Sequence, residues 1–175
     1  MTETSSLFSK KLIGCWATGT PPFSGQIHYR GIIHERTEDA PFMGALIIAA
    51  TCDNGCKDCF NQHLKESRVY IRTAEEIIAE VMQNPFNDGI ILGGLEWSQQ
   101  PREAIELIRC ATASGLQVIL YTGLAEKELY NRIPKEHLVG TLVKFGRYDP
   151  TCLSATYKSF GVCLASTNQY IKQID

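Results

Sequence analysis

Three cysteines of the sequence, Cys52, Cys56 and Cys59, are close enough together to share one metal centre. Cysteines separated by only two or three residues can hardly pair as disulfides without strain, so we interpret them as metal or redox ligands. Gly55 allows the tight turn that would wrap the three thiolates around a common centre. A structural zinc site closes with four protein ligands, whereas three cysteines on a [4Fe-4S] cluster leave one iron open for a substrate or cosubstrate. The spacing therefore favours an iron–sulfur centre with an open position.

A zinc site is the alternative interpretation of the same loop. His63 follows Cys59 by four residues and would complete a Cys3His site, which would make the chain a non-catalytic interaction module. Zinc knuckles normally draw their ligands from two separated pairs, so the clustered cysteines match this alternative less well. Cys110 and Cys163 lie in apolar surroundings and are interpreted as small buried hydrophobic residues outside the site.

Apolar runs predict the strands that must position this loop. Residues 44–50 are apolar without alternation, which is typical of a strand covered on both faces of a parallel sheet. Similar runs predict strands at 89–94, 116–121 and 138–145. Helices are expected between the strands: one from a capping box at Thr73 to Asn84, one from Pro101 to the C-capping Gly115, and a short one over 125–132.

Alternating strands and helices predict a mostly parallel sheet whose active loops lie at the carboxyl ends of the strands. The loops that begin at Cys52, Gly93, Thr122 and Gly146 should then share one mouth. Four or five βα units are too few for a closed eight-fold barrel, so we expect an α/β fold of the truncated (partial) β/α barrel type. We assign residues 28–175 to this domain and residues 1–27 to a loop-rich extension.

Length, charge and hydropathy limit the possible functions. The chain has 175 residues, a mass of 19.5 kDa and a formal charge of −2, which suits one globular domain. Its 17 Lys and Arg residues are spread along the chain and form no basic footprint, which argues against a nucleic-acid partner. The longest apolar run, residues 42–50, is too short to span a membrane, so we expect a cytoplasmic protein without a membrane partner.

The Cys-x3-Cys-x2-Cys spacing directly after a strand resembles the signature of the radical S-adenosylmethionine (SAM) superfamily. The run Gly93-Gly94-Leu95-Glu96 is similar to the Gly-Gly-acid motif of these enzymes, with Leu95 as an inserted residue. The resemblance implies that Gly93, Gly94 and Glu96 bind the methionyl amino group of SAM. Glycines allow main-chain carbonyls to approach an ammonium group closely, and a nearby acid favours its positive charge.

Shorter segments resemble the anaerobic ribonucleoside-triphosphate reductase activating proteins, a family within this superfamily. These segments are Cys59-Phe60-Asn61, Tyr121-Thr122-Gly123 and the stretches 145–149 and 165–170. The resemblance implies a glycyl-radical-enzyme activase, an oxidoreductase that cleaves SAM reductively on a [4Fe-4S] cluster and generates a glycyl radical on the anaerobic reductase. It also implies an electron donor of the flavodoxin or ferredoxin type. Another radical SAM enzyme, acting on a small molecule or a different protein, is the alternative within the superfamily.

Overall fold

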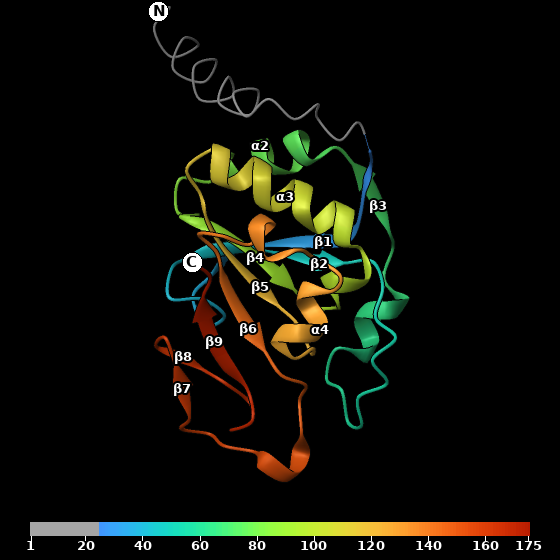
Figure 1. Ribbon diagram of the computed structural model, residues 1–175. Coiled ribbons are helices and arrows are strands. Elements are labelled where there is room, and N and C mark those ends of the chain that lie inside the picture. The colour runs from blue at the N-terminus through green and yellow to red at the C-terminus, as the bar shows by residue number, and fades with distance from the viewer. Residues whose placement is uncertain (1–24) are drawn as a thin grey trace, which may run out of the picture.

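The computed structural model describes residues 25–175 and is built on one seven-stranded sheet (Figure 1). Most of the predicted extension, residues 1–24, lies outside the described residues. The strand order is β3-β1-β2-β4-β5-β6-β9, and the four central strands β2, β4, β5 and β6 are parallel. The strands are β1 (Ile27–Arg36), β2 (Gly44–Ala49), β3 (Tyr70–Arg72), β4 (Gly89–Gly93), β5 (Gln117–Tyr121), β6 (Leu142–Phe145) and β9 (Tyr170–Gln173).

The sheet is open. Its two edges are β3 and β9, and both edge strands as well as β1 run antiparallel to their neighbours. The prediction of an α/β fold with a mostly parallel sheet is therefore confirmed, and the sheet is not closed, whereas its description as part of a barrel is not confirmed. The mixed edges arise because β1 precedes β2 as a hairpin partner and β9 returns beside β6, where no helical crossover intervenes.

Helices cover one face of the sheet. They are α2 (Ala74–Gln83), α3 (Pro101–Ala113) and the short α4 (Glu126–Tyr130). Their buried residues, among them Ile77, Leu107 and Leu129, form one core with the strand residues that face them. As predicted, α2 begins with a capping box at Thr73 and α3 begins at Pro101. Within residues 25–175, no helix is long and apolar enough to cross a membrane.

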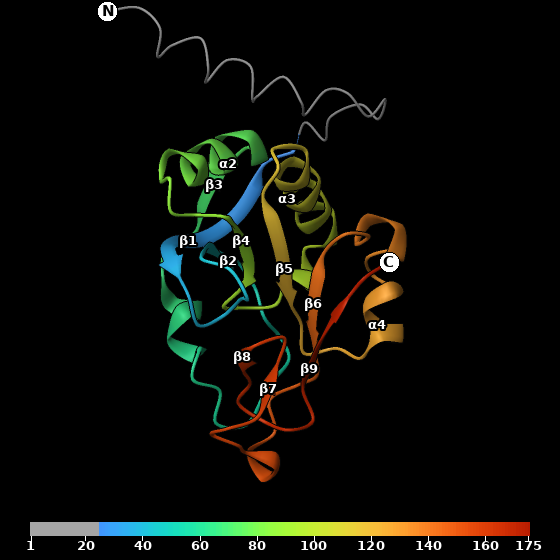
Figure 2. The ribbon, with the colours of Figure 1, turned by 90° about the vertical axis from the view of Figure 1, so that its left-hand side faces the viewer.

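The opposite face of the sheet is covered only in part. A smaller core forms where Phe42, from the β1–β2 connection, and Leu164, next to the hairpin of β7 (Lys158–Ser159) and β8 (Val162–Cys163), pack on Ile91 and Ile119. Figure 2 shows this hairpin apart from α2 and α3, beyond the lower end of the strands. The rest of this face, towards the carboxyl ends of the parallel strands, remains open for a cavity.

Candidate iron–sulfur and cosubstrate site

A cavity of about 490 Å³ lies on the open face of the sheet, at the carboxyl ends of the parallel strands. Cys52, Gly93, Thr122 and Gly146 all line it, each from the end of a different strand or the loop that follows it. The prediction that these four loops share one mouth is confirmed. A cavity of this size suits a small-molecule ligand, for which volumes of about 300–1,000 Å³ are usual.

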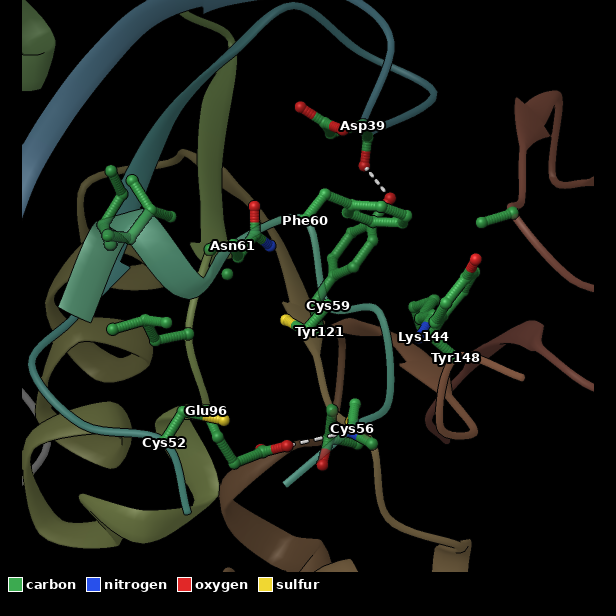
Figure 3. A pocket seen from close by; sticks show the side chains of 18 of the residues that line it. Asp39, Cys52, Cys56, Cys59, Phe60, Asn61, Glu96, Tyr121, Lys144 and Tyr148 are labelled. Atoms are coloured by element: carbon green, nitrogen blue, oxygen red, sulfur yellow. Dashed lines mark hydrogen bonds between the residues drawn. The ribbon is translucent and has the colours of Figure 1, made fainter. Parts of the chain in front are cut away.

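All three cysteines of the loop after β2 line this cavity, and each is partly exposed. The sulfur atoms of Cys52 and Cys59 both face the cavity in Figure 3. Gly55, between Cys52 and Cys56, has a φ of 59°, the left-handed conformation that its predicted turn requires. Burial raises the pKa of the Cys52 thiol, and the backbone amide of Asn54 opposes this by hydrogen bonding to it.

The three cysteines of the loop line one cavity together with His63. Within residues 25–175, no three His, Cys, Asp or Glu side chains lie close enough together to hold one metal ion. His63, the fourth ligand of the zinc alternative, is an exposed residue on the wall of the same cavity. A [4Fe-4S] cluster offers each thiolate a different iron, so its ligands surround a volume and need not meet at one point.

The Gly93-Gly94 pair makes a tight turn at the end of β4. The Leu95 amide donates a hydrogen bond to the Gly93 carbonyl at 2.8 Å across Gly94, whose φ is 73°. A side chain at Gly94 would be strained at this φ, and its Cβ would lie 3.0 Å from Cγ2 of Ile48, which would have to shift slightly. The inserted Leu95 is buried in the helix-side core, and Gly93, Gly94 and Glu96 all line the cavity.

Glu96 is the predicted acid of this motif, and its carboxylate joins three loops. The side chain is 3% exposed. Its Oε2 accepts hydrogen bonds from Nδ2 of Asn54 at 2.9 Å and from the amide of Gly123 at 2.8 Å, while Oε1 accepts one from the Ser98 amide at 3.2 Å. The negative charge is thereby held at the cavity wall, beside the loop that carries the cysteines (Figure 3).

Lys144 is a cavity residue that the sequence reasoning missed. It lies on β6, is 7% exposed, and donates a hydrogen bond from Nζ to the Gly146 carbonyl at 2.7 Å. Burial lowers its pKa to about 8, although the charges of Glu96 and Cys56 raise it. The sequence offered one indication, a lysine inside the otherwise apolar strand 142–145. Lysine side chains are rarely buried unless they have a partner. Its position suits an anionic group of a ligand.

Two cysteines outside the cluster loop have different surroundings. Cys110 is buried within α3, as predicted. The prediction for Cys163 is wrong: its side chain is exposed and it lines the cavity. Cys163 lies on the two-residue strand β8, where Val162 and Leu164 are buried, so alternation along the chain turns Cys163 to the other side.

The carboxyl-terminal segment that resembles the activating proteins braces the loop after β6. Asn168 donates from Nδ2 to the Arg147 carbonyl at 2.8 Å, and Gln169 donates from Nε2 to the Gly146 carbonyl at 3.3 Å. Phe145, at the end of β6, is fully buried and contacts the rings of Tyr130 and Tyr170. These residues support the wall of the cavity.

Comparison with known families identifies the class of cofactor. Residues 43–149, more than half of the chain, match the family described as the 4Fe-4S single cluster domain. The match begins at β2 and ends in the loop after β6, so it contains the four central strands and all three clustered cysteines. A search of curated proteins gave no significant match. The chain belongs to the 4Fe-4S single cluster domain family, and its cofactor is a [4Fe-4S] cluster.

Proposed function

We propose that this chain is a radical SAM activase that generates a glycyl radical on an anaerobic ribonucleoside-triphosphate reductase. The observation that carries the proposal is one cavity lined by both the three cysteines and the Gly93-Gly94 turn. A cluster held by three cysteines has room for a cosubstrate at its fourth iron, and a cavity beside it gives that cosubstrate a place. On this proposal the open sheet corresponds to a truncated β/α barrel.

Cys52, Cys56 and Cys59 are the proposed cluster ligands. They fit the group because they supply three soft thiolate donors on one loop, at the wall of a cavity. When bound, the cluster supplies the electron that cleaves SAM, and a flavodoxin- or ferredoxin-like protein is the proposed source of that electron.

The chain's own residues orient SAM. Gly93 and Gly94 present main-chain groups to the methionyl amino group, which the carboxylate of Glu96 attracts. Lys144, on the neighbouring part of the cavity wall, offers a buried cation to the methionyl carboxylate. The apolar side chains of Leu46, Ile48 and Ile91 line the same cavity and limit the access of water to the reacting atoms.

Single substitutions of the cysteines test the proposal. Cys52→Ala, Cys56→Ala and Cys59→Ala should each abolish the release of 5′-deoxyadenosine from SAM with dithionite after anaerobic reconstitution. Cys152→Ala is the matched control, because Cys152 is also a partly exposed free thiol but does not line the cavity. Normal product release by any of the three loop variants would contradict the ligand assignment.

The partner is tested separately. The reconstituted chain, SAM and the anaerobic reductase are mixed, and a glycyl radical is sought by electron paramagnetic resonance. A radical on the reductase supports the activase. SAM cleavage without a radical on the reductase favours a radical SAM enzyme with another substrate.

A further inference from the structure

The connection between β4 and α3 holds the backbone on both sides of Cys52. The Glu96 amide donates a hydrogen bond to the carbonyl of Thr51 at 3.0 Å, just before the cysteine. The amide of Asp53, just after it, donates to Oε1 of Gln99 at 3.1 Å. Cys52 therefore lies between two fixed points, although the residues that fix it are more than forty positions away in the chain.

Gln100 adds a third contact at the end of β2. Its Oε1 accepts a hydrogen bond from the Ala50 amide at 2.7 Å. Its Nε2 donates to the carbonyl of His28 at 2.8 Å and to Oε2 of Glu103 at 2.9 Å. Since the amide nitrogen is occupied by these two acceptors, the oxygen is left pointing at Ala50. The Gln100 side chain is thus oriented by β1 and by the first turn of α3.

The connection is itself held rigidly against the sheet. Trp97 is fully buried, and its indole Nε1 donates to the Ile47 carbonyl of β2 at 2.9 Å. The carboxylate of Glu96 reaches further along the loop, to the side chain of Asn54. Among the described residues, this connection makes no hydrogen bond to residues 55–59, which carry Cys56 and Cys59. The support is confined to the first ligand of the loop.

We propose that Gln99 and Gln100 are positioning residues that hold Cys52 at the cavity before the cluster binds. The inference rests on the proposed role of Cys52 as a ligand. Neither glutamine lines the cavity, so each acts through the backbone of the cysteine loop. Fixing one ligand in advance reduces the ordering that cluster binding must impose on the loop.

The test measures how well Cys52 is held in the full-length, cluster-free protein. Under anaerobic reducing conditions, the rates of alkylation of Cys52 and Cys56 by iodoacetamide are followed by mass spectrometry of their peptides. Gln99→Met removes the acceptor of the Asp53 amide and should raise the ratio of the Cys52 rate to the Cys56 rate about fivefold. Gln99→Glu keeps an acceptor oxygen and should restore the wild-type ratio.

Two further variants complete the design. Gln117→Met changes an exposed glutamine at the start of β5. This is the amino end of the parallel strands, whereas the cysteine loop lies at their carboxyl end, so the ratio of the two alkylation rates should stay unchanged. Gln100→Met removes the contact to Ala50 together with the two that orient the side chain, so its effect should exceed that of Gln99→Met. Should Gln100→Met fail to fold, the pair of Gln99 variants still decides the question.

Cluster retention gives a second measurement. The reconstituted Gln99→Met protein should lose iron to a chelator several times faster than the Gln99→Glu protein. Equal alkylation ratios and equal rates of iron loss in the two variants would overturn the proposal. Failure of the wild-type protein to cleave SAM would contradict the activase function, but it would leave a shifted alkylation ratio, and hence the positioning role, standing.

Discussion

At the scale of single residues, Glu96 joins three loops and has a proposed role in SAM binding. Its two carboxylate oxygens accept hydrogen bonds on both sides, at Oε2 from Asn54 and Gly123 and at Oε1 from the Ser98 amide. A glutamine has only one oxygen, so its NH2 group would face a donor on the other side. Glu96→Gln should therefore lower the free energy of unfolding by about 2 kcal/mol. On the proposed function it should also weaken SAM binding, because it removes the charge proposed to attract the methionyl ammonium group. Urea unfolding and calorimetric titration with SAM measure the two effects.

Glu136→Gln is the control for this substitution, since Glu136 is exposed and does not line the cavity. It should change neither quantity. An unchanged free energy of unfolding in Glu96→Gln would mean that the three hydrogen bonds to this carboxylate contribute nothing to the joining of the loops.

The buried cation Lys144 makes a prediction about pH. Burial lowers its pKa to about 8 from an ordinary value of 10.5. Between these pH values the unfolded chain binds the proton more tightly than the folded chain, so Lys144 makes stability rise with pH. The free energy of unfolding of the cluster-free wild type, minus that of Lys144→Met, should increase by roughly 3 kcal/mol from pH 8 to 10.5. Chemical denaturation at a series of pH values measures this difference.

The wild-type protein must be compared with a variant because other ionisable groups titrate in the same pH range. Lys158→Met removes an exposed lysine and should show no such divergence from the wild type. Parallel pH profiles for the wild type and Lys144→Met would contradict the lowered pKa.

At the scale of secondary-structure elements, the start of α2 can be tested directly. Oγ1 of Thr73 accepts from the Glu76 amide at 3.2 Å, and Oε2 of Glu76 accepts from the Thr73 amide at 2.9 Å. Thr73→Ala should lower the free energy of unfolding by about 1 kcal/mol, measured with urea, because it leaves an amide of the first turn without its partner. Thr112→Ala, at an exposed position within α3, should have no destabilising effect. Equal losses in the two variants would mean that the capping box is not the cause.

The same elements explain what the sequence could and could not predict. The strands β2, β4 and β5 and the helices α2 and α3 were predicted because unbroken apolar runs and capping residues leave few alternatives. The three antiparallel strands β1, β3 and β9 were missed, because they are short or mix polar with apolar residues on partly exposed faces. The strand predicted at 138–145 begins only at Leu142, since 138–140 form a turn that ends in Gly140.

The site was predictable to the extent that parallel strands bring their carboxyl ends together. This rule was enough to place four loops around one mouth. It gave no information about Lys144 or Cys163, whose directions depend on strand register and on a hairpin that folds over the sheet. Nor did it reveal Gln99 and Gln100, because their contacts to the cysteine loop depend on how a short connection packs against β2.

At the scale of the whole molecule, the cavity is lined by loops that follow all four parallel strands. A ligand bound there should therefore stabilise the entire fold. SAM would contact the cysteine loop after β2 and the turn after β4 at once, and it would have no affinity for the unfolded chain. At a concentration one hundred times its dissociation constant, it should raise the free energy of unfolding by about 2.7 kcal/mol, which corresponds to an increase in Tm of about 5–10 °C. Anaerobic thermal unfolding followed by circular dichroism measures this shift.

The shift should depend on the cluster, because SAM is proposed to bind partly through the open iron. Removal of iron by a chelator should lower the Tm and greatly reduce the further increase on addition of SAM. Cys56→Ala should behave like the chelated protein, whereas Cys152→Ala, whose thiol lies outside the cavity, should respond like the wild type. A full increase in Tm with SAM in the iron-free protein would mean that SAM binds in the cavity without the cluster. The cavity and the cluster would then have to be assigned to different functions.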